Sequence, residues 1–261
     1  MEKLDYCYHS HTKRCGHALG EDEEYVLNAI KAGIKRLGFS DHVFLPTGYE
    51  QPGTRGRFDQ LDDYLRSVKA LKEKYKDQID ILVGFEAEYY DIFEEYYKYL
   101  LKEKIDYLIL GQHCGIRDGK FYWYCYDNCP IERIKEYVDD VIKGLKTGLF
   151  KYLAHPDLFM LSQNEWNTDL ERESRRLLKA CEDLHIPVEL NLCGMRRRYY
   201  NEVNHSYPNI NFYKLIKDYN LKVVVGVDAH DPSQYLDDKL NAAIDFAKRA
   251  GFEIDWDYKI Q

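Results

Sequence analysis

The chain repeatedly places a longer amphipathic segment after a short apolar one, and this alternation constrains the fold more than any other feature of the sequence. Buried strands are expected at Leu4–Tyr8, Leu37–Ser40, Ile79–Glu86, Tyr107–Leu110, Tyr152–Ala154, Pro187–Leu190 and Lys222–Val227. Helices are expected at residues 21–36, 59–76, 92–103, 131–147, 168–184, 210–219 and 237–250. Such strand–helix units predict a parallel α/β sheet covered by helices, either open or closed into a barrel.

Polar residues at the strand ends distinguish these two architectures. Seven of the nine histidines lie at the end of an expected strand or in the loop that follows it, together with several carboxylates. An open sheet gathers its ligands at one crevice, whereas a barrel brings the carboxyl ends of all its strands to one face. Because all seven strand ends contribute polar residues, the pattern favours a barrel, and 261 residues suit a single barrel domain over residues 1–261.

The spacing of the polar residues indicates a metal site. His9 and His11 are two residues apart, as are Asp228 and His230, so the members of each pair project to the same side of a strand. Imidazole and carboxylate ligands together suit Zn, Mn or Fe. Burying so many of these groups without a metal would leave costly unpaired polar atoms. His185 and His205 lie outside the pattern and are expected to be structural or exposed.

The composition limits the partners and the compartment. The formal net charge of −8 argues against nucleic acid and anionic membranes, whose phosphates the protein would repel. We find no signal-peptide pattern and no apolar run long enough to span a membrane. The seven cysteines form no CxxC pair, so free thiols in the cytoplasm are expected. The sequence does not indicate the oligomeric state.

The strand-end motifs resemble those of the PHP (polymerase and histidinol phosphatase) family of metal-dependent phosphoesterases. In family order, they are HSH at His9–His11, SDH at Ser40–His42, GxE at Gly84–Glu86, His113, HPD at His155–Asp157 and DAH at Asp228–His230. The resemblance implies a distorted TIM-like (β/α)7 barrel that holds three divalent metal ions. The ligands it implies are His9, His11, Glu86 and Asp228 for the first ion, Glu86, His113 and His155 for the second, and His17, His42 and His230 for the third.

A segment after the sixth expected strand is similar to the histidinol-phosphatase branch of that family. Residues 189–196 follow the pattern E-x-N-x-x-G-x-R. The resemblance implies hydrolysis of the small molecule L-histidinol phosphate to L-histidinol and phosphate, in histidine biosynthesis, by attack of a metal-bridging hydroxide. Glu86, Asp228 and Arg196 would be its catalytic residues. The alternatives are another phosphomonoester, such as a nucleotide, a sugar phosphate or a phosphotyrosine, and a non-catalytic metal-binding regulator.

Substrate contacts are expected from charged and polar residues near the same strand ends. Arg196 is the preferred phosphate ligand within the run Arg196–Arg198, and Arg117 is a second choice. The remaining candidates are Glu189, Asn191 and Glu88, and Glu88 is also a rival to Glu86 as a metal ligand. The aromatic run at residues 121–126 is expected either to stack on an imidazole substrate or to form a lid that only packs.

Overall fold

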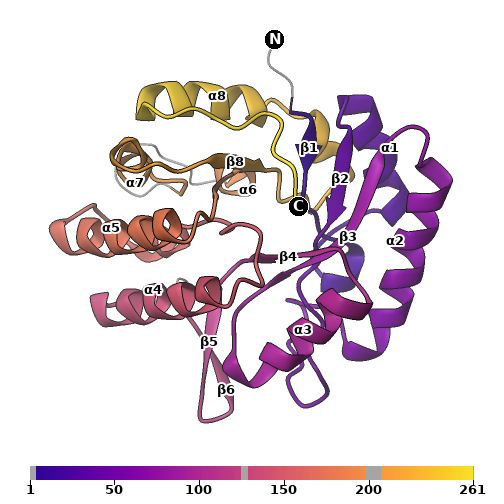
Figure 1. Cartoon of the computed structure of the whole chain (residues 1–261), viewed down its shortest axis with the longest axis horizontal. Coiled ribbons are helices and arrows are strands. Elements are labelled where there is room, and N and C mark those ends of the chain that lie inside the picture. The colour runs from indigo at the N-terminus through magenta and orange to yellow at the C-terminus, as the bar shows by residue number, and fades with distance from the viewer. Residues whose placement is uncertain (1–3, 125–128, 198–206, 261) are drawn as a thin grey trace.

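The computed structural model describes residues 4–124, 129–197 and 207–260, in which a parallel sheet curls around a central core (Figure 1). Strands β1 (Tyr6–Cys7), β2 (Arg36–Phe39), β3 (Asp80–Ala87) and β4 (Tyr107–Leu110) pair in that order. A second parallel pair contains β7 (Val188–Asn191) and β8 (Val223–Gly226). Leu153 links the two groups, because it forms isolated bridges to Leu110 on one side and Val188 on the other.

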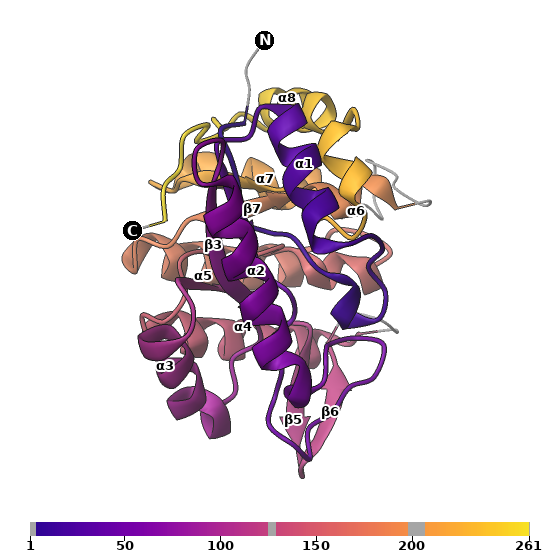
Figure 2. The same cartoon turned by 90° about the vertical axis from the view of Figure 1, so that its right-hand side faces the viewer.

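The helices surround this curled sheet. They are α1 (Asp22–Ala32), α2 (Leu61–Tyr75), α3 (Glu94–Glu103), α4 (Ile131–Lys146), α5 (Thr168–Asp183), α6 (Leu192–Arg196), α7 (Ile210–Lys214) and α8 (Lys239–Ala250). Short 3-10 helices lie at Lys13–Cys15, Phe58–Gln60, Asp91–Phe93, Leu158–Ser162, Ile216–Asp218 and Pro232–Leu236. Helices α4, α5, α7 and α8 stack along one side of the molecule, and α1 and α2 lie on the other (Figures 1 and 2).

The curled sheet forms the barrel wall, and this wall closes differently at the carboxyl and amino ends of its strands. Beyond the carboxyl ends of β1 and β8 the chain segments meet directly, through a bridge between Ser10 and Ala229. Near the amino ends, a C-terminal segment lies between the two strands: Ile254 forms a bridge to Val223, and the Asp5 amide donates to the Trp256 carbonyl at 3.3 Å. The protein is therefore a distorted TIM-like α/β barrel, as expected.

Most of the expected elements form, and one helix and one strand are shorter than expected. The helix expected at residues 21–36 ends early, because Gly33 adopts a φ of 83° and stops it. The strand expected at Tyr152–Ala154 contributes only the bridging residue Leu153, so six of the seven expected strands form as such.

An antiparallel hairpin after β4 was not expected. Strand β5 (Cys114–Arg117) pairs with β6 (Lys120–Trp123) across the turn residues Asp118 and Gly119, both of which have positive φ. Asp-Gly is a favoured two-residue hairpin turn because both residues tolerate that conformation. The aromatic run expected at residues 121–126 therefore begins as a strand, and its members Cys125 and Tyr126 lie outside the described residues.

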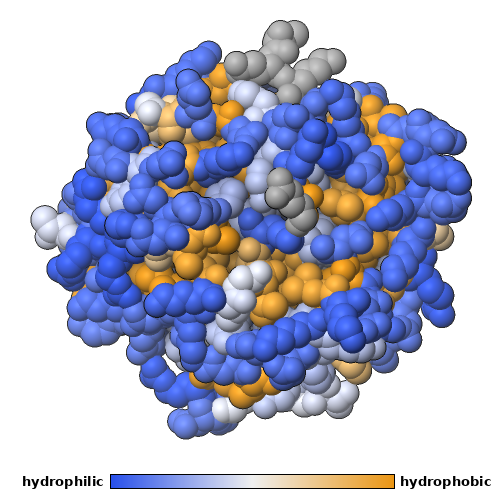
Figure 3. Space-filling model, in the orientation of Figure 1, coloured by the Kyte–Doolittle hydropathy of each residue, from blue (hydrophilic) through white to orange (hydrophobic). Residues whose placement is uncertain are grey.

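The core forms one continuous cluster from Leu4 to Ile254, which supports the single-domain organisation, although that organisation stays a prediction. The face shown in Figure 3 is largely hydrophilic, with apolar side chains visible between the charged ones. No helix in the described part of the chain is both long and apolar enough to cross a membrane.

Candidate metal centre

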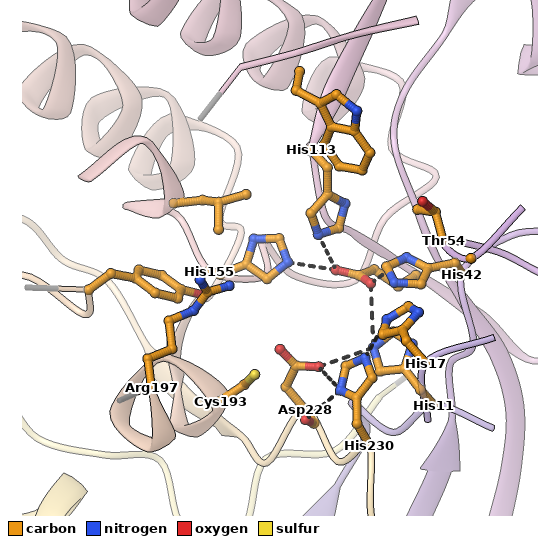
Figure 4. A pocket seen from close by; sticks show the side chains of 15 residues that line it. His11, His17, His42, Thr54, His113, His155, Cys193, Arg197, Asp228 and His230 are labelled. Carbon is orange, nitrogen blue, oxygen red and sulfur yellow. Dashed lines mark hydrogen bonds and ion pairs between the residues drawn. The ribbon is translucent and has the colours of Figure 1, made fainter. Parts of the chain in front are cut away.

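A cavity of about 610 Å³ opens at the carboxyl ends of the strands and gathers most of the expected metal ligands (Figure 4). Eight of the nine line it: His11, His17, His42, Glu86, His113, His155, Asp228 and His230. The ninth, His9, is completely buried behind them. Ligands that are far apart in the sequence therefore converge on one place, because parallel strands direct their carboxyl ends to the same face.

Glu86, near the end of β3, occupies the middle of the cluster. Five imidazole nitrogens lie within 3.7 Å of its carboxylate: Nε2 of His155 at 2.6 Å, Nδ1 of His42 at 3.1 Å, and Nε2 of His9, His11 and His113 at 3.5, 3.6 and 3.7 Å. Burial on its own would raise the pKa of Glu86, but the surrounding imidazoles outweigh it and hold that pKa well below its usual range. The carboxylate is thus kept ionised, the form that binds a metal.

Asp228 provides the second carboxylate, just beyond β8. Its Oδ1 lies 3.1 Å from Nε2 of His11 and 3.5 Å from Nε2 of His9. Asp228 has a φ of 49° and His155 has a φ of 30°, in the left-handed region that residues other than glycine rarely adopt. Such backbone strain costs roughly 1–3 kcal/mol per residue and gathers at functional sites.

A third group lies at the more open edge of the cavity. Nε2 of His17 and Nε2 of His230 are 3.0 Å apart, and these two residues form a possible ion-binding group with His42. Burial lowers the pKa of His230 to about 3 and also lowers that of His17. Two neutral imidazoles therefore direct nitrogens at the same point, as two ligands of one ion would.

The buried polar atoms test whether the residues present fit a metal. Several of them have no hydrogen-bond partner among the described residues: Nε2 of His9, both ring nitrogens of His11, Nδ1 of His42, Nδ1 of His155, Oε2 of Glu86 and Oδ1 of Asp228. Leaving such atoms unpaired in a protein interior is costly. All are nitrogen or carboxylate oxygen, the donors that suit Zn, Mn or Fe, so the cluster fits a set of divalent ions.

Two of the expected substrate residues instead hold the imidazoles of expected metal ligands. Glu189 Oε1 lies 2.8 Å from Nδ1 of His9, and Glu88 Oε1 lies 3.0 Å from Nδ1 of His113. Both carboxylates are fully buried and neither lines the cavity. An ionised carboxylate can only accept here, so each imidazole donates from Nδ1 and directs Nε2 toward the cluster. The geometry thus favours a supporting role for both residues over substrate contact, and makes Glu86 rather than Glu88 the central carboxylate.

The other expected substrate residues also lie away from the cavity wall. Asn191 donates to both Glu189 and Asp228. Arg196 donates to the Val227 and Gln234 carbonyls and to Asp237, while Arg117 pairs with Glu136 on the surface.

Arg197, next to the preferred candidate, does line the cavity. In Figure 4 it lies across the cavity from His42 and Thr54. Among the described residues it is the only lysine or arginine in the lining. Arg198 and His205 fall outside the described residues.

Sequence reasoning missed several residues of the site. Thr54, Leu158 and Tyr207 line the cavity from loops or a short helix, where no periodic pattern marks them. Cys15 forms a possible ion-binding group with His11 and His230, although the cysteines had indicated only the compartment. Trp123 was noted within the aromatic run, and its ring centroid lies 6.5 Å from that of His113.

Comparison with known proteins relates this chain to a protein family. A model of the PHP domain matches residues 8–192. The protein named "Probable histidinol-phosphatase" in Deinococcus radiodurans is 25% identical over 232 residues, which are 87% of this chain and 86% of that relative. The histidinol-phosphatase of Bacillus subtilis is 23% identical over 257 residues, covering 88% of this chain and 94% of that protein.

Solved structures agree on the fold. The histidinol phosphate phosphatase of Lactococcus lactis, crystallised with zinc, L-histidinol and phosphate, superposes with a TM-score of 0.70. The alignment covers 97% of this chain and 95% of that structure at 19% sequence identity.

Proposed function

This chain belongs to the PHP domain family, and from that premise we propose that it is a metal-dependent phosphatase that hydrolyses L-histidinol phosphate to L-histidinol and phosphate. The observation that carries the reaction class is the cluster of imidazoles around the Glu86 carboxylate, with its unpaired buried donor atoms. The substrate is supported by the two relatives, whose names state this activity and which align along most of this chain.

The ligand sets follow the three groups of side chains. His9, His11, Glu86 and Asp228 would hold one ion, Glu86, His113 and His155 a second, and His17, His42 and His230 a third. Divalent ions bound there supply Lewis acidity that stabilises negative charge on a phosphoryl group. Zn, Mn and Fe all match this donor set.

The remaining cavity residues would bind and orient the substrate. The Arg197 guanidinium stands beside the Tyr207 ring, 5.9 Å from its centroid, and offers planar donors to a phosphate on the side of the cavity opposite His42. Trp123, 36% exposed at the cavity, offers a flat surface to an imidazole ring. Buried Leu158 and Tyr207 limit the access of bulk water to the same space.

A substrate panel tests the proposal. Protein loaded separately with Zn, Mn or Fe would be assayed with histidinol phosphate, a nucleotide, a sugar phosphate and phosphotyrosine. We expect the largest kcat/KM for histidinol phosphate. A larger kcat/KM for another ester would assign a different substrate to the same site, and no phosphate release from any ester would refute the phosphatase.

The Trp123→Ala variant, assayed with histidinol phosphate and with glycerol phosphate, tests the imidazole contact. We expect KM for histidinol phosphate to rise about 2- to 10-fold, corresponding to a stacking contribution of about 0.5–1.5 kcal/mol. KM for glycerol phosphate, which has no ring, should not change. Equal changes for both substrates would assign Trp123 a purely structural role.

The protein would act in the cytoplasm. All six described cysteines are free, which supports a reducing compartment. A small phosphomonoester is its proposed partner.

A further inference from the structure

Arg55 is a buried cation that does not line the cavity. Its side chain is 1% exposed, and its Nη2 donates to both carboxylate oxygens of Glu88 at 3.0 Å. Nη1 donates to the Val43 carbonyl at 3.1 Å and Nε donates to Gln51 Oε1 at 2.6 Å. Three separate acceptor groups thus hold the guanidinium in one orientation. A flexible surface arginine is not fixed in this way.

Arg55 belongs to an irregular segment, residues 46–57, that forms part of the cavity wall. Gly53 and Thr54 of this segment line the cavity. The turn that carries them is closed where the Thr54 and Arg55 amides donate to the Gln51 carbonyl, at 3.0 and 3.2 Å. Arg55 therefore attaches this part of the wall to the protein interior immediately after the residues that face the cavity.

Glu88 continues the connection to the metal ligands. Its Oε1 accepts from Nδ1 of His113, whose Nε2 lies 3.7 Å from Oε1 of Glu86. Burial on its own would raise the pKa of Glu88, but Arg55 and His113 outweigh it and hold that pKa below its usual range. Removing one partner of a buried ion pair leaves the other charge uncompensated, so Glu88 would lose its fixed position without Arg55.

We propose that Arg55 is a positioning residue that couples the wall segment 46–57 to the metal site containing His113. It orders Glu88, and Glu88 fixes the His113 ring with Nε2 toward the cluster. Metal binding at His113 and ordering of the wall segment 46–57 then stabilise one another. The inference rests on the metal centre of the proposed function and is independent of the substrate.

The test compares Arg55→Met with Arg57→Met in the full-length protein. Arg57 is a matched control because it is in the same segment but its side chain is exposed and pairs with the exposed Asp59. Titration of metal-free protein with Co²⁺, followed by calorimetry and visible absorption, reports the affinity and geometry of each ion. We expect R55M to bind one ion about 10- to 100-fold more weakly, the usual effect of losing a supporting partner. R57M should bind all ions as the wild type does.

Hydrogen exchange of the backbone amides in the wall segment 46–57 supplies a readout separate from metal affinity. Co²⁺ should slow exchange of the Thr54 and Arg55 amides in the wild type and in R57M, and this protection should be lost in R55M. The Arg55→Lys variant keeps the charge but cannot form the two-pronged contact. It should fold and also bind one ion more weakly. The R55K variant therefore tests the role of Arg55 if R55M does not fold.

The outcomes separate this inference from the proposed function. A folded R55M or R55K that binds Co²⁺ with wild-type affinity and retains wall protection overturns the role of Arg55. Equal weakening of all ions would also overturn it, because it would indicate general destabilisation. Wild-type protein that binds no divalent ion would instead overturn the metal centre, whereas inactivity toward histidinol phosphate would affect only the substrate.

Discussion

At the residue scale, the position of Glu86 depends on the absence of a side chain on the neighbouring strand. A Cβ atom on Gly111, immediately after β4, would collide with the Glu86 carboxylate. Gly226, at the end of β8, leaves similar space for Glu189, which supports His9. The packing of these carboxylates therefore requires glycine for its size at both positions.

Replacing Gly111 by alanine should consequently disturb the metal centre. The added methyl group would displace the Glu86 carboxylate, and we expect the affinity for divalent ions to fall by about 10-fold or more, as when a ligand's supporting contacts are lost. Competition with a coloured chelator measures this change. Circular dichroism of the metal-free variant serves as the control for folding, and unchanged affinity would contradict the requirement for glycine at this position.

Metal binding should release protons near neutral pH. Although burial on its own would lower the pKa of His11, its carboxylate neighbours raise it to about 9, and those of His9 raise its pKa well above the ordinary value. Below about pH 9 the His11 ring therefore carries a second proton in the metal-free protein, and the raised pKa of His9 acts in the same direction. Each imidazole must lose this proton to bind an ion, so the affinity should increase as the pH rises toward 9. Calorimetry in buffers of different ionisation enthalpy measures the released protons. Proton uptake at pH 7.5 would contradict the prediction.

The convergence of the proposed ligands on one cavity could be predicted from the sequence because strand alternation is a local rule. His9 and His11 need only a spacing of two to reach one side of a strand. The different roles of Arg196 and Arg197 could not be predicted. The two residues are adjacent and of the same type, and their side chains differ only in the direction that the end of α6 gives them. Arg55 gave no signal, since its partner Glu88 is distant in the sequence.

At the element scale, α6 assigns its two neighbouring arginines to different tasks. Arg196 ties the helix to the Val227 and Gln234 carbonyls and to Asp237. Arg197 follows the helix and lines the cavity. The contrast permits a paired prediction.

We expect Arg197→Met to reduce kcat/KM by at least about 10-fold, because each charge-assisted contact to phosphate contributes about 1.5–3 kcal/mol. Arg196→Met should instead lower the free energy of unfolding by about 1–3 kcal/mol, through its lost hydrogen bonds. Steady-state kinetics and urea unfolding measure the two effects. The reverse pattern would identify Arg196 as the phosphate ligand, as the family motif implies.

Element boundaries were predictable where an apolar run is continuous, as in β4, which has the expected bounds Tyr107–Leu110. The β5–β6 hairpin was missed because its aromatic residues looked like a continuous loop segment, even though Asp118-Gly119 is a hairpin signal. Leu153 shows the opposite error, since an apolar run predicted a strand where only one residue pairs with both neighbours.

At the scale of the whole molecule, the metal centre joins segments at the ends of β1 to β4 with the segment that follows β8, so metal removal should weaken the whole fold. Each ion present at about 1,000 times its Kd adds about 4 kcal/mol to the free energy of unfolding. A protein of this size loses roughly 2–4 °C in Tm per kcal/mol. Thermal unfolding with and without EDTA measures the difference. The Glu86→Gln variant should show a much smaller response, and an equal response would locate the stabilising ions elsewhere.

The way the barrel wall closes has a consequence for how the protein is made. The ligands proposed for the first ion include His9 and His11 from the start of the barrel and Asp228 from its end, and Ile254 and its neighbours lie between β1 and β8 near the amino ends of these strands. During translation, the early histidines leave the ribosome long before Asp228 is synthesised. The nascent polypeptide can therefore expose several imidazoles but cannot assemble the complete ligand set, so loading of this ion must follow synthesis of β8.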